Sequence, residues 1–108
     1  MTFPADENGD VLRRMQEDGD DLSKARDIDF NYIFPKEEEA VQFSDATRRL
    51  GYERVSHKFW AEKKVWDVLV VVFMLPTHSE ITRVEQRLDA VAREFFGRAD
   101  GWGCLAQK

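Results

Sequence analysis

The chain has 108 residues, of which 43% are hydrophobic and 34% charged, with a formal net charge of −5. That length predicts one domain, and the single cysteine, Cys104, excludes an internal disulfide framework and a metal site built on several cysteines. The longest apolar run, residues 68–75, is far shorter than the ~20 residues that span a bilayer, and no secretory signal opens the chain, so we expect a cytoplasmic protein.

The N-terminal part of the chain is predicted to contain little regular structure. Residues 1–10 are polar, include Pro4 and Gly9 and show no periodicity, so we expect them to be disordered. A short helix is predicted over residues 11–17, and Gly19 then favours a turn. Residues 11–108 are expected to form a single domain.

Two strands and a helix are predicted next. Apolar and polar residues alternate over residues 28–34, which predicts a strand that Pro35 ends. Three glutamates at residues 37–39 favour the start of a helix, and Gly51 is placed to end it. Residues 52–61 are predicted to form the second strand.

The last three elements follow from equally local signals. Residues 66–75 predict a strand whose two faces are both covered, because its apolar run is nearly unbroken. Thr77 and Glu80 have the spacing of a capping box at the start of a helix that runs to Gly97. Asp100 and Gly101 then predict a turn into a short final strand.

This order of elements is β-α-β-β-α-β, which is the ferredoxin-like pattern. We therefore predict an α+β domain with a four-stranded antiparallel sheet, two helices on one face and a short N-terminal helical segment. Because the helices cover only one face of the sheet, the other face is expected to meet the N-terminal segment or a second subunit. The residues of the 66–75 strand that point to that other face are Leu69, Val71, Phe73 and Leu75.

The acidic excess lies entirely in the N-terminal part of the chain. Residues 1–29 contain nine acidic and four basic residues, a net charge of −5, and the rest of the chain is balanced. Such a segment repels phosphate backbones and suits a basic partner, although it could serve solubility alone. The residues expected to bind a partner are Glu17, Asp18, Asp20, Asp21, Asp27 and Asp29.

No set of residues predicts catalysis, a metal or a cofactor. The sequence has no nucleophile elbow and no glycine-rich phosphate loop. Acidic residues within residues 6–17 approach the spacing of a calcium loop, but Val11 stands where that loop needs glycine. Cys104 is predicted to be a small buried hydrophobe, and His57 and His78 are too far apart in sequence to suggest a pair.

A nucleic-acid-binding function is disfavoured for a second reason besides charge. RNA-recognition modules share the predicted element order, but residues 66–73 lack their basic, glycine-containing signature. A modest basic patch near the end of the first long helix and the following hairpin stays open as an alternative. Its residues are Arg48, Arg49, Arg54, Lys58, Lys63 and Lys64.

Three short segments together resemble a known family. They are the acidic glycine turn in residues 15–21, the helix stop in residues 50–53, and the sequence Asp100-Gly101-Trp102-Gly103. In this order they resemble the ribonuclease E inhibitors, or regulators of ribonuclease E activity B, over about residues 11–106. This chain departs from that family in carrying its acidic residues at the N-terminal end rather than in a C-terminal extension.

The resemblance implies a ferredoxin-like fold and a protein that binds an endoribonuclease and restrains RNA cleavage without being an enzyme. The alternatives are a small-molecule-sensing or oligomerising ferredoxin-like domain and, less favoured, an RNA-binding module. Both a monomer and a homodimer are compatible with the sequence. Trp102 is predicted to lie at the edge of the core, with its indole N–H bonded to a partner.

Overall fold

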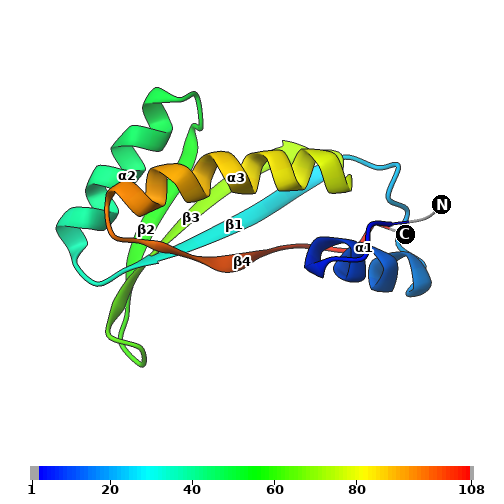
Figure 1. Cartoon of the computed structure of the whole chain (residues 1–108), viewed down its shortest axis with the longest axis horizontal. Coiled ribbons are helices and arrows are strands. Elements are labelled where there is room, and N and C mark those ends of the chain that lie inside the picture. Colours follow the sequence, from blue (N-terminus) through cyan, green and yellow to red (C-terminus); the bar gives the residue numbers. More distant parts are fainter. Residues whose placement is uncertain (1–2, 108) are drawn as a thin grey trace.

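Three helices and four strands make up the computed structural model, which describes residues 3–107 (Figure 1). In chain order they are α1 (Glu7–Glu17), β1 (Arg26–Phe34), α2 (Glu37–Arg49), β2 (Arg54–Trp60), β3 (Val65–Met74), α3 (His78–Glu94) and β4 (Arg98–Cys104). The predicted disorder of residues 1–2 lies outside the described residues.

The first helix begins four residues earlier than predicted. The Asp6 carboxylate accepts a hydrogen bond of 2.8 Å from the backbone N–H of Gly9, which makes Asp6 the N-cap of α1. The helix also buries Leu12 completely in the core. Residues 7–10 are therefore helical rather than disordered, because a capped first turn and a buried anchor outweigh their polar composition.

The four strands form one antiparallel sheet in the order β2-β3-β1-β4. β1 lies in the middle and pairs with β3 along its whole length, so that Phe30 faces Val70 across the ladder. After α1, the elements follow each other as strand, helix, strand, strand, helix and strand. The α+β class and the four-stranded antiparallel sheet are thus confirmed.

The Asp100–Gly101 turn predicted before the last strand is instead an irregularity inside β4. Phe30 pairs with Trp102 and Tyr32 pairs with Ala99, so β4 contains one more residue than β1 over this stretch. Gly101 has φ +92°, a conformation that glycine adopts without steric cost. The turn signal therefore produces a β-bulge, which bends the strand without ending it.

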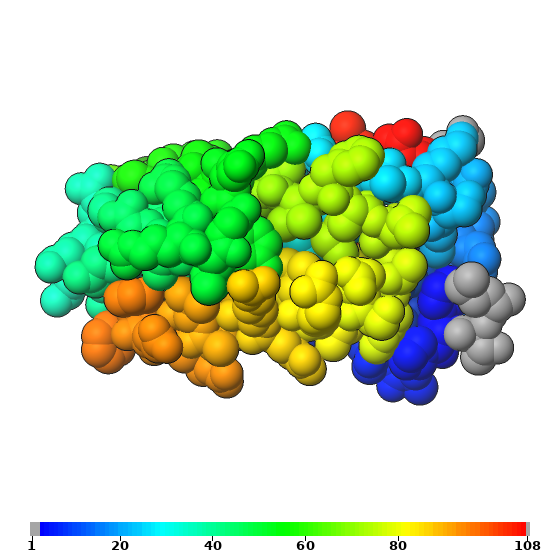
Figure 2. Space-filling model, turned by 90° about the horizontal axis from the view of Figure 1, so that it is seen from above, coloured from blue at the N-terminus to red at the C-terminus, as the bar shows by residue number. Residues whose placement is uncertain are grey.

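α2 and α3 lie on one face of the sheet (Figures 1 and 2), and α1 packs beside α3 at one end of the sheet and adds Leu12 to the same core. That face carries the inward side chains of β1 and β3, which meet Phe43 of α2, Leu88 of α3 and Leu12 of α1 in one core. The buried strand residues are Ile28, Phe30, Tyr32, Phe34, Val68 and Val70. α1 covers the end of this face near the C-terminal part of β4, beside α3.

The opposite face of the sheet is not covered by any described element, which corrects two expectations. Phe73 is 69% exposed and Leu75 is 45% exposed, so the second face of β3 is open. The N-terminal segment does not reach this face, because Leu12 and Met15 join the core on the helical side. Coverage by a second subunit stays a prediction.

Candidate functional site

The uncovered sheet surface, which we call the open face, combines apolar and charged side chains. Its members are the alternate residues of three neighbouring strands that point away from the helices, as the cross-strand register gives them. They are Asp27, Asp29, Asn31 and the buried Ile33 of β1, Val65, Asp67, Leu69, Val71 and Phe73 of β3, and Arg54, Ser56, Lys58 and Trp60 of β2.

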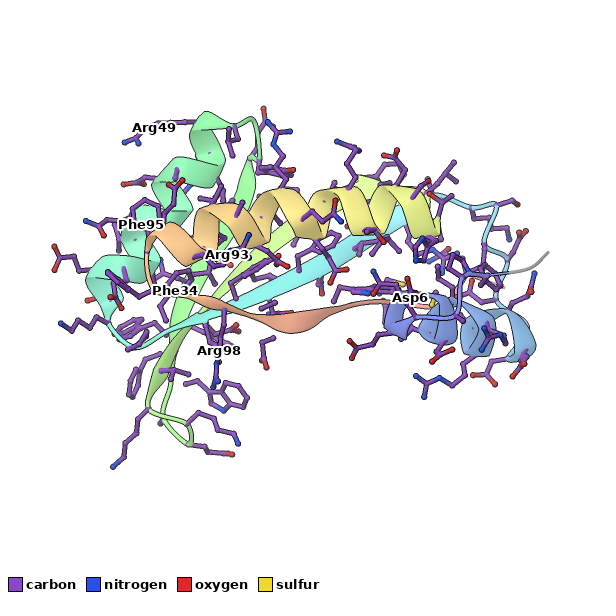
Figure 3. The ribbon with its side chains drawn as sticks, in the orientation of Figure 1. Asp6, Phe34, Arg49, Arg93, Phe95 and Arg98 are labelled. Carbon is purple, nitrogen blue, oxygen red and sulfur yellow. The ribbon has the colours of Figure 1, made fainter. Side chains whose placement is uncertain are left out.

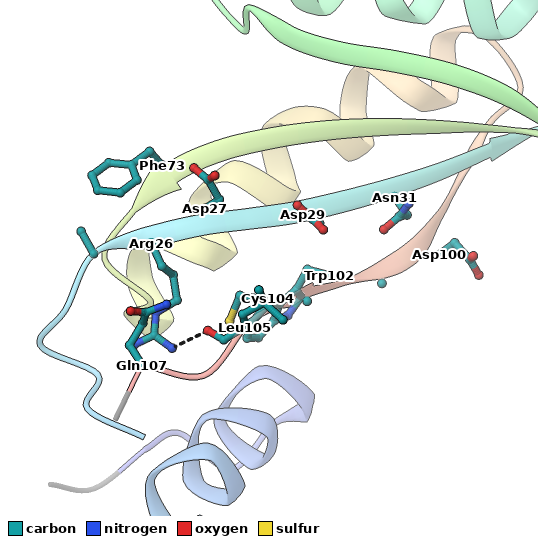
Figure 4. A pocket seen from close by; sticks show the side chains of 13 residues that line it. Arg26, Asp27, Asp29, Asn31, Phe73, Asp100, Trp102, Cys104, Leu105 and Gln107 are labelled. Carbon is teal, nitrogen blue, oxygen red and sulfur yellow. Dashed lines mark hydrogen bonds between the residues drawn. The ribbon is translucent and has the colours of Figure 1, made fainter. Parts of the chain in front are cut away.

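A hollow of about 750 Å³ lies on this face between the N-terminal half of β1 and strand β4 (Figure 4). Asp27 and Asp29 of β1 line it together with Asp100 of β4, and Phe73 and Leu105 add apolar surface. A smaller hollow of about 250 Å³ shares Asp29 with the first and extends towards β2. The two hollows together make the concave part of the open face.

The carboxylates around the larger hollow differ in their partners. Asp27 accepts two hydrogen bonds from the Arg54 guanidinium, at 2.7 and 3.0 Å, and this contact lowers the pKa of Asp27. The side chains of Asp29 and Asp100 make no hydrogen bond or ion pair with any residue that the structure describes. Two carboxylates are thus left to interact with a ligand or with water.

Asp20, one of the residues expected to bind a partner, is buried away from the surface. Its carboxylate lies 2.7 Å from the Arg26 guanidinium, and both side chains are almost completely inaccessible. The hydrogen bond from Arg26 holds the pKa of Asp20 below its ordinary value, and the backbone N–H of Gln107 also donates to Asp20 at 3.1 Å. Asp20 thus joins the turn after α1 to the C-terminal end of the described chain.

The other predicted acidic residues do not form one surface either. Asp21 accepts hydrogen bonds from the backbone and the hydroxyl of Ser23, at 3.0 and 2.6 Å, which lower its pKa and stabilise the turn. Glu17 and Asp18 are exposed at the C-terminal end of α1. The structure therefore brings only Asp27 and Asp29 together on the open face.

Trp102 occupies the position predicted for it. Its side chain packs against the core, and its indole Nε1 donates a hydrogen bond of 2.9 Å to Oδ1 of Asn8. The amide of Asn8 also donates to Glu85 at 2.6 Å and to Thr82 at 3.2 Å. Sequence reasoning missed Asn8, because no local pattern shows that a residue in α1 reaches both α3 and β4.

The histidines and the cysteine have structural surroundings. His78 lies 2.8 Å from Asp6 and joins the first turns of α1 and α3, while His57 lies 3.7 Å from Glu37. Cys104 is partly buried, and burial raises the pKa of its thiol. Within residues 3–107 no group of three or more metal-binding side chains comes together, and no helix there has the length and apolarity to cross a membrane.

The predicted basic patch is divided between two ends of the molecule. Arg48 and Arg49 lie at the end of α2 (Figure 3), where Arg48 pairs with Asp45 at 3.1 Å. Lys63 and Lys64 lie in the turn at the other end of strand β2, and Lys63 is 6.0 Å from the Trp60 ring centre. A seven-residue strand is about 20 Å long, so the two ends do not form one patch. Arg54 and Lys58 lie on β2 between them and belong to the open face, where Arg54 is bonded to Asp27.

Comparison with known proteins gives one family. A family model described as regulator of ribonuclease activity B matches residues 5–104, which is nearly the whole chain. No curated protein matches the sequence.

Proposed function

Because the chain belongs to the family of regulators of ribonuclease activity B, we propose that it is a non-catalytic protein that binds and inhibits a ribonuclease E-type endoribonuclease. The observation that carries this proposal is the match over residues 5–104. The family is one of regulators rather than of catalysts. A role in regulating ribonuclease activity follows from membership of this family. That the target is a ribonuclease E-type enzyme, and that the chain inhibits it by direct binding, is our inference.

The charge of the molecule supports a mechanism that needs no chemistry. An endoribonuclease holds RNA through basic surfaces, because the phosphate backbone dominates affinity for nucleic acids. A protein with a net charge of −5 and unpaired carboxylates on an exposed concave face is suited to occupy such a surface. We propose that binding there excludes RNA from the enzyme, in the cytoplasm where RNA is degraded.

The direct test combines capture with a cleavage assay. The full chain, immobilised in native cell extract, should retain an endoribonuclease that mass spectrometry identifies. The purified enzyme should then cleave a fluorescent RNA more slowly as the chain is added, with bovine serum albumin as the control. An enzyme that is neither retained nor slowed would contradict the proposal.

The exposed acidic residues at the end of α1 are expected to act on the rate of association. Glu17→Gln with Asp18→Asn should slow binding to the purified nuclease and flatten its salt dependence, because exposed charges steer encounter and are screened by salt. Association measured between about 50 and about 300 mM salt checks this. Asp20 is left unchanged, because it is buried in an ion pair. If the association rate and its salt dependence were unchanged in the variant, Glu17 and Asp18 would contribute to solubility but not to binding.

A small-molecule-sensing domain is the second candidate, and the 750 Å³ hollow is the observation that favours it. A metabolite that binds there should raise the melting temperature of the protein. RNA-recognition modules use the same sheet surface, but here its carboxylates repel phosphate, and its two aromatic members, Phe73 and Trp60, lie near opposite ends of strand β3. The element order and the strand order support the ferredoxin-like assignment, which we retain as a proposal. A single domain also stays a proposal, with its start moved from residue 11 to α1 at Glu7.

A further inference from the structure

The larger hollow on the open face has features of a binding surface that go beyond the family assignment. It lies where no helix covers the sheet, and it is bounded by strand β1 on one side and by β4 on the other (Figure 4). Large exposed apolar side chains edge it, since Phe73 is 69% exposed and Leu105 is 82% exposed. Exposed apolar groups beside a concave surface are typical of an interaction site.

The chemistry of the occupant follows from the charges that line the hollow. Asp29 and Asp100 are unpaired, and Asp27 is bonded to Arg54 at the outer edge of the sheet. The one basic residue in the lining, Arg26, has its charge matched by buried Asp20 at 2.7 Å and donates its remaining hydrogen bonds to backbone carbonyls. The described residues that line the hollow therefore include no free cation, and their net charge is negative.

A cationic side chain with an aliphatic stem fits both features. The stem of an arginine or lysine covers apolar surface such as Phe73, while its charged end donates to carboxylates. An RNA would instead bring phosphates towards Asp29 and Asp100. A second copy of this chain would bring the same carboxylates to the contact.

We propose that the open face, centred on Asp29, Asp100 and Phe73, binds an arginine- or lysine-rich segment of the ribonuclease partner. This inference deepens the proposed function and rests on it, since it names the surface and the chemistry through which the partner is held. On this proposal, the basic residues with which the ribonuclease binds RNA are the groups that occupy the hollow.

The test removes the unpaired charges and compares the result with a matched control. Asp29→Asn with Asp100→Asn removes two charges inside the hollow. Glu53→Gln with Glu62→Gln removes two charges from exposed positions outside it and gives the same net charge. Phe73→Ser tests the apolar edge separately. Equal melting temperatures ensure that binding rather than folding is compared.

Binding is measured with the purified nuclease and with a synthetic peptide of alternating arginine and alanine, whose glutamine-alanine analogue is the control. We expect the two-aspartate variant to lose about tenfold or more in affinity for both the nuclease and the arginine peptide. Phe73→Ser should also weaken binding to both. The glutamate control should stay within about twofold, because exposed charges outside a contact contribute little.

The outcomes separate this inference from the proposed function. If the nuclease binds all variants and the wild-type chain equally, the inference is wrong and the function stands. If the nuclease does not bind, but the arginine peptide binds and depends on Asp29 and Asp100, the proposed function fails and the recognition of cationic segments stands. Equal losses in the glutamate control, or dimers in light scattering that Phe73→Ser dissociates, would overturn the inference.

Discussion

Gly97 lies at the junction of α3 and β4 at a place where a side chain has no room. A Cβ atom on Gly97 would overlap the ring of Phe34, which is completely buried. The preceding residue, Phe96, takes the positive φ of 64° that ends the helix, although a glycine would adopt it more easily. The glycine at position 97 is therefore needed for close approach rather than for backbone freedom.

Gly97→Ala should destabilise the protein by about 2–3 kcal/mol, because the added methyl group forces the Phe34 ring or the backbone to shift. Gly103→Ala is the matched control, since a Cβ atom there meets open space and the stability should change by less than about 1 kcal/mol. Urea unfolding of both variants measures the difference. Equal stability of the two variants would show that the core relaxes around the methyl group.

At the scale of elements, local patterns predicted the six elements of the β-α-β-β-α-β order within a few residues of their observed bounds. The alternation over residues 28–34 and the capping spacing of Thr77 and Glu80 are local signals, and β1 and α3 follow them. The early start of α1 was missed because its stability comes from tertiary contacts of Leu12 and Asn8. Such contacts between distant segments leave no periodic pattern in the sequence of residues 1–10.

The attachment of α1 to the rest of the fold is expected to depend on Asn8. Asn8→Ala should destabilise the protein by about 2 kcal/mol, because it removes three side-chain hydrogen bonds to β4 and α3. In a double-mutant cycle with Trp102→Phe, which removes the indole N–H, the coupling should be about 1 kcal/mol. A cycle of Trp102→Phe with Asp10→Ala, an exposed residue of the same helix, should give no coupling. Additive effects of Asn8→Ala and Trp102→Phe would contradict the contact.

For the whole molecule, the buried pair of Asp20 and Arg26 connects segments that are far apart in sequence. Arg26 donates to the carbonyl of Leu105 at 3.2 Å, and Asp20 accepts from Gln107. The backbone N–H of Asp21 also donates to the carbonyl of Gln107 at 2.7 Å. In the sequence, the turn after α1 looks like an exposed run of acidic residues. One of them, Asp20, is instead part of the protein interior.

Asp20→Asn should destabilise the fold by about 3 kcal/mol at pH 7, because Arg26 is left buried without its counter-charge. The pKa of Asp20 is lowered in the folded state, so its stabilising effect is complete above about pH 4 and is lost as the pH falls through the folded pKa. The difference in unfolding free energy between wild type and variant should therefore shrink between pH 7 and pH 3. Asp18→Asn, an exposed neighbour, should cost less than about 0.5 kcal/mol at either pH. A difference that does not change with pH would contradict the ion pair.

The candidate site was only partly predictable, and the reason is geometric. Charge counting found an acidic N-terminal third, but it could not separate Asp20, which is buried, from Asp29, which faces solvent beside a hollow. Asp100 was absent from the expected set because it is distant in sequence and meets β1 only through sheet pairing. The apolar run of β3 indicated burial on both faces, whereas one of its faces is open.

The bulge in β4 has a consequence for how the molecule behaves among its own copies. β4 is an edge strand, and regular edge strands offer free backbone groups to the edges of neighbouring molecules. The extra residue and the positive φ of Gly101 twist that edge away from the straight geometry that such pairing requires. At the other edge, β2 presents the exposed Lys58, whose charge opposes the approach of a second β2. Both borders of the sheet thus carry features that oppose edge-to-edge pairing with another copy.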